Sequence, residues 1–146
     1  MKARRLGTAA LALALALVSL GAGPAHRFEA SGSRGWIKFS GGGRIRLEGK
    51  GTLKIRNASN LQLEVQGTWG SLEPVLDGAD YYHFQGSVDS VGLGGRFEIR
   101  GWDLRLTVHG RGKARFRGEG SCRLDEGQAI PWTDHPERWT KVDFED

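Results

Sequence analysis

The residues whose chemistry could support catalysis or metal binding are few in this chain. The four histidines, at positions 26, 83, 109 and 135, form neither an HxH nor an HExxH pattern, and no pair has the spacing of zinc ligands. Cys122 is the single cysteine, so it cannot form an internal disulfide or build a metal cluster by itself. We expect a small buried thiol, surface histidines, no metal and no cofactor.

Catalytic motifs are also missing from the sequence, which contains no GxSxG nucleophile elbow and no P-loop. The Gly-X-Gly segments join predicted strands rather than opening a helix, so we do not expect them to bind phosphate. Carboxylates at Glu73, Asp77 and Asp80 occupy an irregular stretch, where two could converge as in glycoside hydrolases. A solvated loop is the favoured interpretation, because no aromatic-lined cleft is indicated around them. We therefore expect no catalytic residues and no enzyme activity.

Basic side chains at outward strand positions are the most distinctive chemical feature. In an exported protein such a face would bind anionic envelope polymers or lipid head groups. The alternative is a solvated face whose charges protect sheet edges from aggregation. Tryptophans at strand edges could stack on sugar rings or on a partner, although closing the ends of a small sandwich is the favoured interpretation for them as a group. The candidate binding face consists of Trp36, Arg44, Arg46, Lys54, Arg56, Trp102, Lys113, Arg115 and Arg117.

The elements that must position these side chains are β-strands. Every even position from Leu104 to Leu124 is apolar or glycine, and the odd positions are mostly charged or polar. A period of two predicts strands with one buried and one wet face. The odd positions from Ile37 to Ile55 follow the same pattern. A shift of 106 − 37 = 69 positions lays Ile37–Ile55 on Leu106–Leu124, which we interpret as an internal repeat.

The apolar residues stay on the same odd or even positions before and after each Gly-X-Gly segment. This predicts three-residue hairpin loops, which preserve the alternation. Gly110–Gly112 would then place His109 opposite Lys113. A corner in a β-solenoid would preserve the alternation equally well. The predicted fold is all-β, an antiparallel meander of short strands that forms a small sandwich or barrel, with a compact β-solenoid as the alternative.

The N-terminus has the features of a secretory signal peptide over Met1–Ala25, with basic residues followed by the apolar run Leu11–Leu20. The run is short for a membrane span, so we expect none after cleavage, and a retained anchor is the alternative. Cleavage removes three of the 21 basic residues and none of the 17 acidic ones, which leaves 18 − 17 = +1. The high isoelectric point of the whole chain therefore does not indicate nucleic acid as a partner.

The rest of the chain divides into three predicted parts. Residues 26–34 are expected to form a flexible leader, residues 35–132 a single β domain, and residues 133–146 an acidic C-terminal tail. A mature chain of 146 − 25 = 121 residues suits one domain with one core. Trp139, Val142 and Phe144 would let the tail pack back as a last strand or cap.

The second half of the β body carries a resemblance to a known group. It contains L-D-G-A-D-Y-Y-H-F-Q-G-S-V from Leu76, then L-R-L-T-V-H-G-R-G-K-A-R-F-R-G-E-G-S-C, then Pro131-Trp132. These segments resemble small exported bacterial glycine-rich β-strand proteins, which repeat a G-x-G-x-Φ-x-Φ-x-G-x-G pattern near a C-terminal tryptophan. The resemblance implies export and an all-β fold, and it supplies no activity or site residues. The sequence departs from the pattern at Cys122, where an aromatic residue is usual.

These observations predict a non-enzymatic protein of the cell envelope, periplasmic, envelope-bound or secreted, that acts as a binding or structural β domain. The alternative is a small β-barrel that carries an apolar ligand, because glycines at many inward positions would leave space. Its predicted lining consists of Ile45, Leu47, Leu104, Leu106, Val108 and Phe116.

Overall fold

The computed structural model describes residues 2–4 and 25–146, and its strands belong to one antiparallel sheet. This confirms the predicted all-β antiparallel fold. The elements are β1 (Lys2–Arg4), β2 (His26–Arg56), the 3-10 turn η1 (Ala58–Asn60), β3 (Leu61–Trp69), β4 (Ser71–Val75), β5 (Gly78–Leu124), β6 (Ile130–Pro131) and β7 (Thr140–Asp143). Within the described residues, no helix has the length and apolar character needed to cross a membrane.

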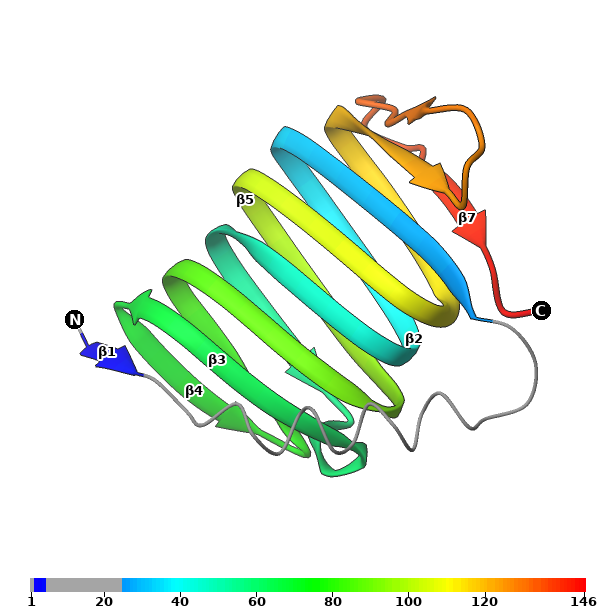
Figure 1. Ribbon diagram of the computed structural model, residues 1–146. Coiled ribbons are helices and arrows are strands. Elements are labelled where there is room, and N and C mark those ends of the chain that lie inside the picture. Colours follow the sequence, from blue (N-terminus) through cyan, green and yellow to red (C-terminus); the bar gives the residue numbers. More distant parts are fainter. Residues whose placement is uncertain (1, 5–24) are drawn as a thin grey trace.

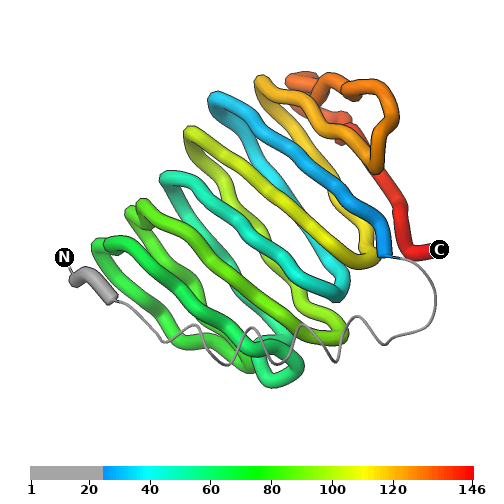
Figure 2. The backbone as a smooth tube through the Cα atoms, viewed as in Figure 1, coloured from blue at the N-terminus to red at the C-terminus, as the bar shows by residue number. Residues whose placement is uncertain are grey.

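The two long strands β2 and β5 run antiparallel and wind together into a flattened coil (Figures 1 and 2). Most residues of β2 therefore pair with two residues of β5, one on either side. Ile37 pairs with both Ile99 and Phe116, and Ile45 pairs with both Ser90 and Val108. One turn of β5 thus takes 116 − 99 = 17 or 108 − 90 = 18 residues. The shorter strands β3 and β4 extend one end of the coil, and β6 and β7 lie at the other (Figure 1).

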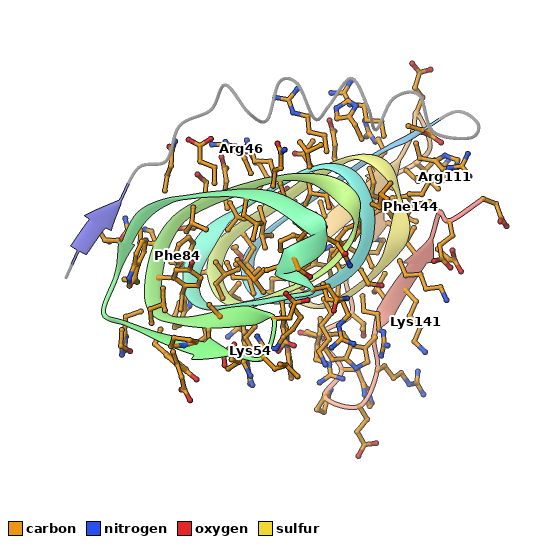
Figure 3. The ribbon with its side chains drawn as sticks, turned by 90° about the horizontal axis from the view of Figure 1, so that it is seen from below. Arg46, Lys54, Phe84, Arg111, Lys141 and Phe144 are labelled. Carbon is orange, nitrogen blue, oxygen red and sulfur yellow. The ribbon has the colours of Figure 1, made fainter. Side chains whose placement is uncertain are left out.

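The flattened coil has two layers of nearly straight segments, which we name after residues labelled in Figure 3. The end-on view places Arg46 and Lys54 on opposite sides of the coil, with Phe84 in its interior. The Arg46 layer comprises residues 27–31, 44–48, 62–66, 87–91, 105–109 and 121–123. The Lys54 layer comprises residues 36–40, 52–56, 71–75, 78–82, 96–100, 113–117 and 140–143.

The alternation predicted from the sequence fills the space between the layers. Inward side chains of both long strands form one hydrophobic core, in which Phe116 stacks on Phe28 at 5.7 Å and on Trp132 at 5.1 Å between ring centroids. The six residues proposed to line an apolar ligand cavity belong to this packed core. Each of them is at most 2% exposed: Ile45, Leu47, Leu104, Leu106, Val108 and Phe116.

The Gly-X-Gly segments are corners of continuous strands, so the predicted hairpin loops are wrong. Gly41–Gly43 lies within β2 and Gly110–Gly112 within β5, and His109 pairs with Arg44 and Arg27 rather than with Lys113. The two backbones approach closely there, because a Cβ atom on Gly43 would lie 2.2 Å from the carbonyl oxygen of His109. A bend in a continuing strand preserves the alternation just as a three-residue loop does. The strands are accordingly long, and only their straight segments are short.

At the ends of the domain, the predicted flexible leader is wrong, whereas the tail packs back as a last strand, which the sequence had offered through Trp139, Val142 and Phe144. Residues 26–34, expected to be a flexible leader, form the first part of β2 and pair with β5 on both sides. In the expected acidic tail, β7 pairs with β5 and the Phe144 side chain is 3% exposed. Hydrogen bonds to two sides and burial of an aromatic ring outweigh the polar composition of these segments. The predicted signal peptide lies outside the described residues, apart from Ala25 and β1, which pairs with β3.

Candidate anion-binding surface

The structure divides the predicted basic face between the two layers. Arg44 and Arg46 belong to the Arg46 layer, whereas the other five basic residues and Trp36 belong to the Lys54 layer. Trp102 lies at a corner between the layers, where it pairs with Arg34 and Lys50. Within each predicted alternating run the outward residues of the two layers fall on the same odd or even positions, as Arg46 and Lys54 do. The sequence pattern alone therefore could not separate the two sides of the molecule.

On the Arg46 layer the central cation is already compensated. Arg46 forms ion pairs with Glu48 at 2.9 Å and with Asp89 at 2.7 Å. Desolvation lowers the pKa of the Arg46 guanidinium, but the hydrogen bonds to Glu48 and Asp89 outweigh this effect and raise the pKa overall. Glu29 pairs with Arg27 at 2.8 Å on the same layer. Charges of both signs thus alternate here, which suits a solvated face better than an anion site.

The Lys54 layer contains a shallow hollow of about 490 Å³ in which positive charge accumulates. Phe39, Phe97 and Ser40 contribute to its lining, and among the described residues Glu98 is the only carboxylate that lines it. The cross-strand register brings the cations together, since Lys54 and Lys38 both flank Glu98. We call this site the cationic hollow, and its basic residues are Lys38, Lys54, Arg56, Arg96, Lys113 and Arg115.

Several of these cations have no acidic partner in the part of the chain that the structure describes. Arg56 pairs with Asp80 at 2.7 Å and Lys113 with Glu145 at 3.3 Å. Lys54, Arg96 and Arg115 form no ion pair with any described residue. The Glu98 carboxylate instead accepts a hydrogen bond from the Trp36 indole nitrogen at 2.9 Å. The hollow therefore presents uncompensated positive charge to solvent.

A stack of cations and indoles borders the cationic hollow. The guanidinium of Arg100 lies 4.5 Å from the ring centroid of Trp36, and that of Arg117 lies 4.1 Å from Trp139. The ammonium of Lys38 lies over both rings, at 4.9 Å from Trp36 and 5.3 Å from Trp139. Each such contact stabilises an exposed cation by about 0.5–1 kcal/mol. The stack therefore holds these long side chains in place with much of their positive charge still available.

The predicted candidate face lacked four members of this surface: Lys38, Arg96, Arg100 and Trp139. Arg96 and Arg100 flank the alternating residues Phe97-Glu98-Ile99, so a period of two would have placed both side chains outward. Trp139 reaches the surface from the segment that was predicted to be a tail. The apolar residues of that segment allowed for a last strand, but the contact of Trp139 with Trp36 depends on where β7 pairs with β5.

The other candidate residues have structural roles. Cys122 is 2% exposed, as predicted, and burial raises the pKa of its thiol to about 11. Asp77 accepts hydrogen bonds from the backbone and the hydroxyl of Ser59, and Asp80 pairs with Arg56. No cluster of three or more histidine, cysteine, aspartate or glutamate side chains suited to a metal ion occurs among the residues that the structure describes.

Comparison with known proteins adds no relative to this picture. No family model matches the sequence, no curated protein matches it, and no solved structure matches the fold.

Proposed function

We propose that this protein is an exported, non-enzymatic binding domain whose Lys54 layer holds an anionic polymer of the cell envelope. The observation that carries the proposal is the cationic hollow, in which Lys54, Arg96 and Arg115 have no acidic partner among the described residues. Like charges held together in this way repel each other in the free protein. A bound polyanion relieves that repulsion.

A linear polymer suits the arrangement of the charges better than a membrane surface does. The cations stand on neighbouring strands, which lie about 4.8 Å apart, so they form rows across the sheet. A chain with regularly spaced negative groups can follow such a row. The large exposed apolar side chains, including Leu76 and Leu93, do not line the cationic hollow, so the hollow itself offers no apolar anchor for a bilayer.

The test compares two triple variants that change the net charge equally. Lys54→Gln/Arg96→Gln/Arg115→Gln removes three cations of the hollow that form no ion pair with a described residue and leaves Lys38, which lies over the indole rings. Arg44→Gln/Arg105→Gln/Arg123→Gln removes three exposed cations from the Arg46 layer, none of which forms an ion pair with a described residue. The probes are polygalacturonate, polyphosphate and vesicles of phosphatidylglycerol, with binding measured at low salt and again at 0.5 M NaCl.

We expect the first variant to bind polygalacturonate and polyphosphate about 3- to 150-fold more weakly, because three exposed ion pairs contribute about 0.2–1 kcal/mol each. The control variant should bind nearly as the wild type does. If both variants lose the same affinity for the polyanion, net charge alone accounts for binding, and the cationic hollow is not a specific site. Binding to vesicles alone would replace the polymer with a lipid surface.

The export part of the proposal has its own measurement. The support for it is the arrangement of basic, apolar and small residues over Met1–Ala25. Mass spectrometry of the protein from the culture medium or the periplasm should give a chain that begins at His26. A chain that retains Met1 in the cytoplasmic fraction would contradict export.

A further inference from the structure

A groove runs along the coil edge next to the cationic hollow, with a volume of about 900 Å³. Its floor follows four glycines that lie side by side on successive strands, because Gly51 and Gly35 both pair with Gly101, and Gly35 also pairs with Gly118. We call this the edge groove. It crosses β2 and β5 parallel to the coil axis, in the same direction as the rows of the cationic hollow.

The bare floor is a consequence of the fold. A Cβ atom on Gly101 would lie 1.8 Å from the carbonyl oxygen of Lys50, and one on Gly118 would lie 2.4 Å from that of Arg34. Contacts this short are not tolerated, so the corner accepts only glycine. A ligand in the groove can therefore approach the backbone directly, as it does in other glycine-lined sites.

The walls combine indole rings with guanidinium groups. Trp36 and Arg100 form one wall, and Trp102 and Arg34 line the groove on the side of the corner. Trp102 is 59% exposed, although a residue of this type is usually highly buried. Such an indole offers a flat apolar face to a ring-shaped ligand at little cost in side-chain entropy.

Arg100 is the cation best placed to pair with a ligand. One face of its guanidinium rests on Trp36, and it forms no ion pair with a described residue. Arg34 is already bound to Glu119 at 2.9 Å, and Arg117 donates a hydrogen bond to the carbonyl oxygen of Arg138. Stacking leaves the edge of the Arg100 guanidinium free, and that edge matches a carboxylate through two parallel hydrogen bonds.

Both ends of the groove disfavour anions. The Asp134 carboxylate lines the end at Gly118, whose amide donates a hydrogen bond to the carbonyl oxygen of the neighbouring Thr133. Tyr82 lies at the other end, and desolvation together with the negative charges of Asp80 and Glu73 raises the pKa of its phenol. The centre, between Trp102 and Arg100, is therefore the favoured place for a negatively charged group. It stands next to the cationic hollow, since Trp36 and Lys38 alternate on one strand and Arg115 and Arg117 on another.

We propose that the edge groove binds an acidic oligosaccharide of the uronic-acid class, with a sugar ring against Trp102 and a carboxylate paired to Arg100. This inference rests on the proposed function and specifies its ligand: the cationic hollow holds the charges of the polymer, and the edge groove recognises its rings. A polyanion without rings, such as polyphosphate, would use the hollow alone.

The experiment measures binding of tetragalacturonate, polyphosphate and single-stranded oligodeoxythymidylate to the wild type and to four variants. Trp102→Ala removes the exposed ring, Trp102→Phe keeps an aromatic face, and Arg100→Gln removes the central charge. Leu93→Ala is the control, because Leu93 is 91% exposed and does not line the groove. Thermal unfolding of each variant verifies that the fold is retained.

We expect Trp102→Ala and Arg100→Gln to weaken tetragalacturonate binding about five- to tenfold, while Trp102→Phe keeps most of the affinity. Polyphosphate binding should not change in Trp102→Ala or Leu93→Ala. If Trp102→Ala binds tetragalacturonate like the wild type, the groove inference fails. The proposed function would still stand in that case if polyphosphate binding depends on Lys54, Arg96 and Arg115. If none of the three probes binds, both proposals fail. Tighter binding of the oligonucleotide than of the uronate would replace the sugar with a nucleic acid.

Discussion

Substituting Gly43 with alanine tests whether the Gly-X-Gly segments are corners pressed against a neighbouring strand. Gly43 has a φ of 113°, where an L-residue is strained by about 1–3 kcal/mol. The new Cβ atom would also lie 2.2 Å from the carbonyl oxygen of His109 and 2.7 Å from the Cα atom of Gly110. Moving one backbone away from the other costs about 1–3 kcal/mol more. We therefore expect Gly43→Ala to lower the free energy of unfolding by about 4 kcal/mol.

The control is Gly94→Ala, because a Cβ atom there meets nothing within 4 Å. That variant should be unchanged or more stable by about 0.4–1 kcal/mol, since alanine restricts the unfolded chain. Urea and thermal unfolding measure both, and a loss of about 4 kcal/mol corresponds to a fall in Tm of roughly 15 °C. A loss below about 1 kcal/mol in Gly43→Ala would refute the corner, because strain in an exposed loop would then account for the whole effect.

Three further predictions concern the core, the thiol and the C-terminal end. Phe116→Ala should destabilise the protein by about 3–5 kcal/mol in urea unfolding, because the ring is fully buried; a loss below 1 kcal/mol would contradict the packed core. Cys122 should resist iodoacetamide at pH 8 in the native protein and react in urea, because burial raises the pKa of its thiol to about 11; equal rates would contradict this. His26 should titrate above 6.5 by NMR, because hydrogen bonds to the main-chain carbonyl of Asp146 and to the Asp125 carboxylate raise its pKa. Its stabilising effect is thus fully present below pH 6.5 and is lost as pH rises through the raised value, and an unchanged midpoint in Asp125→Asn would contradict the Asp125 contact.

The fold could be predicted from the sequence as far as the alternation extends. The period of two correctly placed Leu104, Leu106 and Val108 in the core and their neighbours outside. It could not reveal how the chain continues after a glycine segment, because hairpin loops and corners both keep the alternation. That difference depends on pairing between residues such as Ile37 and Phe116, which lie 116 − 37 = 79 positions apart. The internal repeat stays a prediction.

The sequence predicted which basic and aromatic residues face outward, but not which of them lie together on one side of the molecule. Parity placed Arg46 and Lys54 outward, but only the winding of the coil shows that they lie on opposite sides (Figure 3). Two features of the sequence would have improved the prediction. Arg96 and Arg100 flank an apolar alternation, and Trp139 accompanies Val142 and Phe144 in a segment able to pair.

Fold and proposed site have a common origin in the corner glycines. The chain turns between layers where β2 and β5 approach too closely for a Cβ atom, so the corner must consist of residues such as Gly35 and Gly101. The same residues leave the floor of the edge groove without side chains. A substitution at Gly35 would therefore damage the coil and the groove together, and a loss of binding in such a variant would not identify a binding residue. Trp102 and Arg100 stand on the walls and are exposed, so changes there alter the ligand contacts and leave the corner intact.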